Sequence, residues 1–476
     1  MQYEPVTQDA GATASPTARP HKGRIIISSL VGTSIEFYDF YVYATAAISV
    51  FPFLFFHSDS DTGALLASLA TFGVAFVARP IGSVLFGHFG DRTGRKATLL
   101  ASLLTMGIAT VLIGLLPTYY QIGLWAPTLL AIMRFCQGLG LGGEWSGASL
   151  LAGENSRPGH RGFDAMWPQL GAPIGFLFAN GFFYLLTQSM HYDSTTATHQ
   201  HPFLIWGWRL PFLASLVIVV LGVYVRFKLD ETPSFKKARA AGQVVKSPLR
   251  ETFRTSWREV IRGTFVMPAT YTLFYLMTTW ILSYAIGKTS SGLLGISYSR
   301  FLVLQLISII AFAIMTPISG WLGDRFGRKA FLGTVTAAIA VFGLAFGLFL
   351  DRARIGTGEN ADMGHLLAFL LVGMTLMGLT FGIQSALLPE LFPTNVRYTG
   401  SAIAYNVASI LGAAVAPFIA AWLAATFGPE SVGLYLTSMA VLTLIAVLSV
   451  KETSRVDLDA IGGQAPDDEP EKVAVG

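Results

Sequence analysis

Five ionisable side chains lie inside long apolar runs in the first half of the chain. They are Glu36, Asp39, Arg79, Arg134 and Glu144. A charge surrounded by hydrocarbon is costly, so such residues are uncommon and normally mark an ion or substrate pathway. The centres of the apolar runs in the second half contain no ionisable side chain. The sequence therefore predicts ion chemistry in the first half and neutral polar or aromatic contacts in the second.

Glu36 and Asp39 are three residues apart and so share one face of a helix. Arg134 lies about twelve residues into its own run, roughly 18 Å along a helix, at the depth of these two acids. We expect Asp39 and Arg134 to pair and, with Glu36, to couple protons. Burial favours a protonated aspartate and a nearby arginine favours the ionised form, so a movement of Arg134 would load or release a proton. The alternative is a static ion pair that only fixes two helices.

Arg79 and Glu144 form a second candidate pair, because they lie at similar depths in the second and fourth runs. A purely structural pair and a role in an inner gate or proton exit both fit this spacing.

Aromatic and amide side chains in the same runs suit a polar, planar or carboxylate solute, although many such side chains only satisfy one another. Arg134 is different, because a buried cation favours an anionic group. The substrate-binding candidates are Arg134, Tyr38, Gln169, Asn180, Tyr271, Tyr275, Gln384, Tyr405 and Asn406.

Metal, redox and nucleotide chemistry have little support in the sequence. The single cysteine, Cys136, allows no disulfide within the chain and no cysteine-based metal site. The eight histidines lie in loops, tails or the ends of apolar runs. Gly287-Lys288-Thr289 lacks the earlier glycine of a phosphate-binding loop. We therefore expect no metal and no cofactor.

The elements that position these residues are membrane-spanning helices. The chain has 476 residues, of which 53% are hydrophobic and 13% charged, and a bilayer core requires about 20 apolar residues per helix. We predict an all-α polytopic protein with twelve spans. They lie near residues 25–56, 62–88, 97–116, 122–150, 163–189, 207–227, 262–287, 299–322, 330–350, 363–388, 399–424 and 431–450.

Basic residues predict the orientation of these spans. Most of the 32 Lys and Arg lie in the two tails and in the loops on the same side, which the positive-inside rule makes cytoplasmic. The predicted organisation is a cytoplasmic tail (1–24), a six-helix bundle (25–228), a basic cytoplasmic loop (229–261), a second six-helix bundle (262–452) and an acidic cytoplasmic tail (453–476). The basic loop is a hinge between the halves or a contact with anionic lipid.

An internal repeat supports the division into halves. Gly87-His88-Phe89-Gly90-Asp91-Arg92-Thr93-Gly94-Arg95-Lys96 recurs as Gly320-Trp321-Leu322-Gly323-Asp324-Arg325-Phe326-Gly327-Arg328-Lys329. Parallel repeats imply two bundles related by an axis along the membrane normal, with the binding site between them. We predict a cytoplasmic gate of ion pairs from Asp91, Arg95, Glu154, Arg161, Asp324, Arg328, Glu390 and Arg397. A plain turn with topology charges is the alternative.

The doubled Gly-x-x-x-Asp-Arg-x-Gly-Arg-Lys signature resembles the major facilitator superfamily. Further motifs resemble its metabolite:H+ symporter family, whose members carry α-ketoglutarate, citrate, shikimate, or proline and betaine. These motifs are Gly32 to Tyr41 (GTSIEFYDFY), Ala78-Arg79-Pro80, Arg134 to Gly138 (RFCQG), Gly142-Gly143-Glu144-Trp145 and Glu231-Thr232-Pro233. The resemblance implies the major facilitator fold. It also implies proton coupling through an acid in span one and an arginine in span four.

The sequence thus predicts a secondary carrier of a bacterial inner membrane, with both termini cytoplasmic, that takes up a small carboxylate or zwitterion with protons. Its expected partners are the solute, protons and membrane lipid, with no nucleic acid, and a monomer suffices. Proton-driven efflux of a metabolite or drug is the alternative, and a membrane enzyme is a remote one. The sequence leaves the solute, the stoichiometry and the choice between proton and sodium open.

Overall fold

The computed structural model describes most of the chain as helices. The described residues are 22–58, 60–93, 95–142, 152–153, 156, 159–192, 200–227, 248–393 and 396–454, with the side chains of 22–25, 28, 87–93, 95–99, 225–227 and 248 left out. Within these ranges there are α-, 3-10 and π-helices and no β-strand.

The first half contains eleven described helical segments along the chain. They are α1 (Lys22–Ser49), α2 (Phe51–Leu54), α3 (Asp61–Thr93), α4 (Arg95–Leu115), α5 (Tyr119–Ile122), α6 (Trp125–Leu141), α8 (Arg161–Ala165), η1 (Trp167–Leu170), α9 (Gly171–Ser189), η2 (Phe203–Gly207) and α10 (Arg209–Phe227).

The second half begins with a short helix that precedes its first span. Its segments are α12 (Pro248–Thr255), α13 (Trp257–Val266), α14 (Pro268–Tyr275), η3 (Leu276–Trp280), α15 (Ile281–Ile286), η4 (Thr289–Ser291), α16 (Tyr298–Phe326), α17 (Arg328–Leu344), α18 (Phe346–Leu350), α19 (Arg352–Ile355), η5 (Gly358–Asn360), α20 (Met363–Glu390), α21 (Arg397–Ser409), η6 (Ile410–Ala414), α22 (Ala416–Phe427) and α23 (Pro429–Ser449).

Eight helical stretches among the described residues are long and apolar enough to cross a bilayer, or nine if α17 and the bent segment after it count as one span. The polytopic, all-helical prediction is confirmed. The predicted twelve spans correspond to these nine together with α1, α4 and α6. The last three do not pass on length and composition, so the full count stays a prediction.

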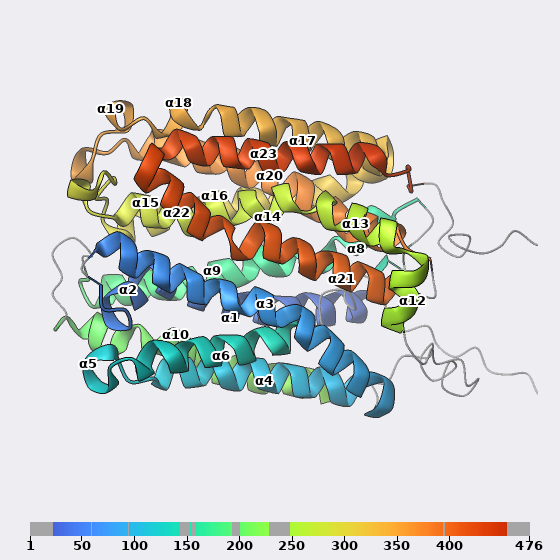
Figure 1. Cartoon of the computed structure of the whole chain (residues 1–476), viewed down its shortest axis with the longest axis horizontal. Helices are drawn as coiled ribbons and strands as arrows, with labels where there is room; N and C mark the ends of the chain where they lie inside the picture. Colours follow the sequence, from blue (N-terminus) through green and yellow to red (C-terminus); the bar gives the residue numbers. More distant parts are fainter. Residues whose placement is uncertain are drawn as a thin grey trace, which may run out of the picture.

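The two halves lie side by side, with their helices along the long axis of the molecule (Figure 1). In the first half α1 packs on α9 and α10, while α6 packs on α3 and α4. In the second half α16 packs on α20, and α17 packs on α23. Two seams join the halves: α9 and α8 contact α16, and α3 contacts α21, η6 and α22. Residues on both sides of these seams can therefore form one site.

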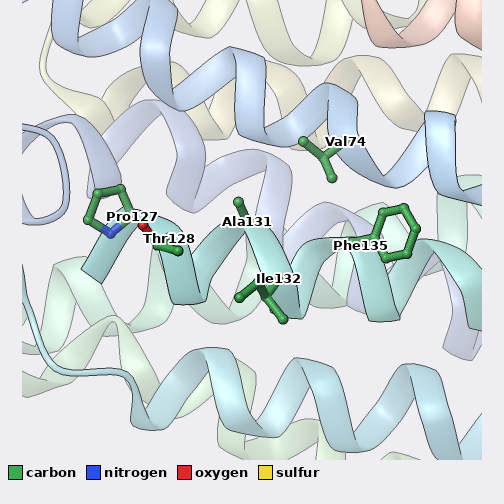
Figure 2. Close-up of a pocket in the computed structure, with 6 residues that line it drawn as sticks. All are labelled: Val74, Pro127, Thr128, Ala131, Ile132 and Phe135. Atoms are coloured by element: carbon green, nitrogen blue, oxygen red, sulfur yellow. The ribbon is translucent and has the colours of Figure 1, made fainter. Parts of the chain in front are cut away.

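The outer surface of the bundle is apolar, as a protein in lipid requires. On α10, Leu216, Val217, Val220 and Leu221 are all more than half exposed. A groove between α3 and α6 opens onto this surface and is lined by Val74, Pro127, Thr128, Ala131, Ile132 and Phe135 (Figure 2). The hydroxyl of Thr128 donates to the Leu124 carbonyl, so the groove offers almost no free polar group. It suits a lipid acyl chain and not a polar solute.

Glycines allow α3 and α6 to approach closely. A Cβ atom on Gly138 would lie 2.3 Å from the carbonyl oxygen of Ala75, and one on Gly82 would lie 2.1 Å from that of Leu139. Both neighbours are backbone atoms, which cannot move aside as a flexible side chain can. Small residues at helix crossings are the usual route to close packing in membranes.

We predict that Gly138→Ala lowers the thermal unfolding midpoint of the purified protein in detergent, because overpacking costs about 1–3 kcal/mol. Gly181→Ala is the matched control, since a Cβ there meets no atom within 4 Å. Equal midpoints for the two variants would show that α3 and α6 can move apart to accommodate the added methyl group, which would contradict the prediction.

Candidate functional site

Asp39 lies fully buried on α1, inside the first half and away from lipid. The hydroxyl of Ser215 on α10 donates to its Oδ1 at 2.5 Å. The hydroxyl of Thr110 on α4 lies 3.3 Å from its Oδ2 and 3.0 Å from the Met106 carbonyl oxygen of its own helix, so its proton is shared between the two acceptors. Both carboxylate oxygens therefore have donors from neighbouring helices. Neutral hydroxyls can donate to an ionised carboxylate or accept from a protonated one, so this environment suits either state.

Arg134 is also fully buried, on α6. Its guanidinium carbon lies 4.0 Å from the ring centroid of Tyr43, 4.7 Å from that of Phe40 and 5.1 Å from that of Phe72. One terminal nitrogen donates to the side-chain oxygen of Gln137, and the other has no hydrogen-bond partner among the described residues. Aromatic faces thus hold this cation in place of a carboxylate.

The expected direct pair between Asp39 and Arg134 is wrong for this conformation: no ion pair joins them in the part of the chain that the structure describes. The reason is that hydroxyls from α4 and α10 occupy the carboxylate, while aromatic rings surround the guanidinium. Gln137 connects the two groups, because its amide nitrogen donates to the Thr110 hydroxyl at 2.9 Å and Thr110 donates to Asp39. The link is a relay through neutral groups.

Glu36 pairs with Arg79, at 3.8 Å between Oε1 and Nη2, and both side chains are more than nine-tenths buried. The sequence had suggested Glu144 as the partner of Arg79, but Glu144 lies outside the described residues. Arg79 also faces the rings of Phe76 and Phe40, at 5.1 and 5.4 Å from their centroids. Phe40 therefore lies between the two buried guanidinium groups.

Tyrosines of the second half complete this centre. The ring of Tyr275 lies 5.6 Å from those of Phe72 and Phe76 and 5.9 Å from that of Phe40. Tyr271 on α14 and Tyr405 on α21 pack edge to face at 5.5 Å, and α21 contacts α3, the helix that carries Arg79. Glu36, Arg79 and these tyrosines form what we call the central cluster. It contains charge from one half and phenol hydroxyls from the other.

The remaining substrate candidates bond or pack elsewhere in the two bundles. Tyr38 donates to the Pro211 carbonyl on α10, and Asn180 accepts from Thr45, so both serve packing within the first half. Gln384 donates to the Val266 carbonyl within the second half. Asn406 crosses between halves and donates to Ser83 at 2.9 Å. Gln169 is buried in η1, which packs against α1, α16 and α20.

Charged groups join the halves at one end of the bundle, which we call the signature end because it carries the Asp324–Lys329 segment between α16 and α17. Arg161 of the first half pairs with Glu390 of the second at 3.0 Å. Glu390 also accepts from Arg328 at 3.3 Å, and Arg328 pairs with Asp324 at 2.7 Å. Asp324 accepts from the backbone N–H groups of Gly162 and Phe163 at 2.8 and 2.9 Å. This conformation is closed at the signature end.

Close backbone contact accompanies these ion pairs. A Cβ on Gly320 would lie 2.7 Å from the Gly162 carbonyl oxygen, and one on Gly162 would lie 2.8 Å from that of Gly320. The opposite end is also bridged, by an exposed pair between Lys288 and Asp61 at 2.8 Å.

Three of the eight predicted gate residues lie beyond what the structure describes: Glu154 and the side chains of Asp91 and Arg95. Arg397 is buried, and its Nε donates to the Phe392 carbonyl at 3.2 Å.

Sequence reasoning missed Glu452 and Thr453, which follow α23 and contact the gate. The Glu452 carboxylate accepts from the backbone N–H groups of Arg328 and Lys329, and the Thr453 hydroxyl donates to Glu390. Partial burial raises the pKa of Glu452, but N–H groups of Ser454, Arg328 and Lys329 outweigh it, and the pKa lies below its usual range. The repeat of Glu231-Thr232 as Glu452-Thr453 was the available signal.

Two bundles with an internal repeat, an apolar outer surface and buried charges between them define a membrane transporter and not an enzyme. A family model described as "Sugar (and other) transporter" matches residues 25–463. The chain belongs to this family of the major facilitator superfamily.

The chain is 52% identical to the inner membrane metabolite transport protein YhjE of Escherichia coli K12, over 92% of this chain and 96% of that one. It is 32% identical to the proline/betaine transporter of Salmonella typhimurium, over 95% and 88% of the two chains. Its fold is similar to that of the proton:xylose symporter XylE, with a TM-score of 0.68 at 18% identity, covering 92% and 98%. The predicted superfamily and fold are confirmed. The finer role of each site residue stays a prediction.

We predict that Glu390→Gln opens the signature end, because it removes the anion shared by Arg161 and Arg328. Breaking a buried pair from one side costs about 3–5 kcal/mol. The distance between spin labels at positions 224 and 326 would be measured by pulsed electron paramagnetic resonance in a protein with Cys136 replaced by Ala. We expect this distance to be longer in Glu390→Gln than in the same protein with Glu390 retained. Glu359→Gln, an exposed acid at the other end, is the control and should leave the distance unchanged. An unchanged distance in Glu390→Gln would count against this gate.

Proposed function

We propose that the protein is a proton-coupled symporter that takes up a small polar metabolite by alternating access. The observation that carries the proposal is the buried acid and buried guanidinium inside one half, joined through Thr110 and Gln137. Ionisable groups at this depth are retained for transport chemistry in most membrane proteins. The proline/betaine and metabolite transport names of the relatives support the same class.

Proton coupling would use Asp39 as the carrier. In the present conformation the donors to the Asp39 carboxylate among the described residues are neutral, and the Arg134 cation lies against aromatic rings. If α6 shifts so that Arg134 approaches Asp39, the cation stabilises the carboxylate and the proton leaves. If Arg134 returns to Tyr43 and Phe40, the buried carboxyl regains its proton. Gln137 and Thr110 would transmit this movement. Gln137 bonds Arg134 and Thr110, and Thr110 bonds Gln137 and Asp39.

Substrate binding would use the central cluster between the halves. Arg79 can bind a carboxylate in bidentate fashion, and Glu36 together with the aromatic rings can bind an ammonium group. The tyrosines of the second half supply hydroxyls for the remaining polar atoms. A small carboxylate or zwitterion fits this set of groups, and the substrate would release Glu36 from Arg79 when it binds.

Orientation and assembly complete the proposal. The signature end would face the cytoplasm of a bacterium, with both termini on that side, in agreement with the distribution of Lys and Arg. The present conformation would then be closed toward the cytoplasm. One chain carries every proposed residue, so a monomer suffices, and no cofactor is required beyond the proton gradient.

The first test is uptake by proteoliposomes of a panel of labelled carboxylates and zwitterions under an inward proton gradient, with and without protonophore. We predict that Asp39→Asn retains exchange of the accumulated solute but loses uphill accumulation, because an amide cannot release a proton. Equal accumulation by this variant and the natural protein would remove Asp39 from coupling. Efflux of preloaded solute on proton entry, without uptake, would establish antiport instead.

We predict that Thr110→Val lowers the accumulation ratio about tenfold while exchange continues. The substitution keeps the shape of the side chain and removes the hydroxyl between Gln137 and Asp39, a loss of about 1–1.5 kcal/mol. Thr105→Val is the control, since that hydroxyl only bonds the Ala101 carbonyl on the same helix. Identical ratios in the two variants would exclude the relay.

A further inference from the structure

Two parallel stripes run from α12 onto the first turns of α13. One stripe is apolar, with residues spaced four apart and between 36% and 52% exposed: Leu249, Phe253, Trp257, Ile261 and Phe265. The other follows one position later and consists of exposed arginines: Arg250, Arg254, Arg258 and Arg262. Residues four apart lie on one helix face, so an apolar and a basic stripe are adjacent within α12 and again within α13, and Ser256 separates the two helices.

The position of α12 places these stripes at the edge of the bilayer. The helix lies at the signature end and runs across the bundle, whereas the spans run along it (Figure 1). Thr252 of α12 and Ser256, which follows the helix, are buried, and the helix packs against α21 and α13. The apolar stripe then continues through Ile261 and Phe265, which are exposed at the start of the span Trp257–Ile286.

This surface is positively charged. It carries four arginines and two acids, Glu251 and Glu259, and Glu259 pairs with Arg262 at 3.9 Å. Arg258 lies 5.4 Å from the ring of Trp257, so the guanidinium and indole form one amphipathic unit. An aromatic ring at the interface with arginines beside it is the usual composition of a lipid-anchoring helix.

We infer that α12 and the start of α13 form a binding surface for anionic phospholipid of the adjoining leaflet. Arg250, Arg254 and Arg258 contact the headgroup phosphates, and Leu249, Phe253 and Trp257 enter the acyl region. The helix α12 packs on α21, which carries Tyr405, and it precedes α13 and α14, the second of which carries Tyr271. A lipid bound to α12 therefore holds the second half in place at the signature end. This inference does not depend on proton coupling.

The test uses the purified full-length protein in detergent and measures its thermal unfolding midpoint on addition of phosphatidylglycerol, phosphatidylcholine or glycerol phosphate. We expect phosphatidylglycerol alone to raise the midpoint. Each arginine contributes about fivefold to affinity for an anionic surface, so the triple variant Arg250→Gln, Arg254→Gln, Arg258→Gln requires roughly a hundredfold more lipid. Arg352→Gln with Arg354→Gln, two arginines at the other end, is the control and keeps the full response.

A second measurement covers the case in which the triple variant fails to fold. Brominated phosphatidylglycerol should quench the fluorescence of the natural protein more than that of Trp257→Phe, and brominated phosphatidylcholine should not distinguish them. A full lipid response in the triple variant, or equal quenching by both lipids, would overturn the inference. An equal shift with glycerol phosphate would identify a site for free phosphate in place of lipid.

Discussion

A bilayer offers no water to a charge, and the arrangement of the first half follows from this constraint. Asp39, Arg134, Glu36 and Arg79 each lie on a different turn or helix, yet all four point into the bundle. Hydroxyls, an amide, aromatic faces and one ion pair replace the lost solvation. Each replacement comes from a neighbouring helix, so the charges also fix how α1, α3, α4, α6 and α10 pack. The residues proposed to serve transport are therefore largely the ones that stabilise the half.

The same constraint applies at the signature end. The buried Glu390 carboxylate needs hydrogen-bond donors whether the two halves are together or apart. Glu390 accepts from Arg161 of the first half, but also from Arg328 and Thr453 of its own half. When the halves separate, only the Arg161 contact is lost. The full penalty of an unpaired buried charge never arises. Two arrangements of similar free energy are what a switching interface requires.

The sequence predicted the elements and the depth of the charges better than their partners. Hydrophobic runs and the doubled signature were enough to place the helices and to predict that Asp324, Arg328, Arg161 and Glu390 meet. The expected contact of Asp39 with Arg134 does not form in this conformation, because depth along a helix does not report rotation about it. Thr110 and Ser215 carry no signal of their own, since hydroxyls are common in apolar helices and usually bond the preceding turn. Only the packing of α4 and α10 shows which ones reach Asp39.

The two halves differ in chemistry although they repeat in sequence. Ionised groups of the central cluster come from α1 and α3, while the second half contributes Tyr271, Tyr275 and Tyr405. Phe40 contacts both guanidinium groups of the first half and the ring of Tyr275 in the second. A solute that separates Glu36 from Arg79, as proposed, would lie near a ring that also faces Arg134. Since Arg134 is linked to Asp39 through Gln137 and Thr110, occupation of the central cluster and the protonation of Asp39 act on the same set of contacts.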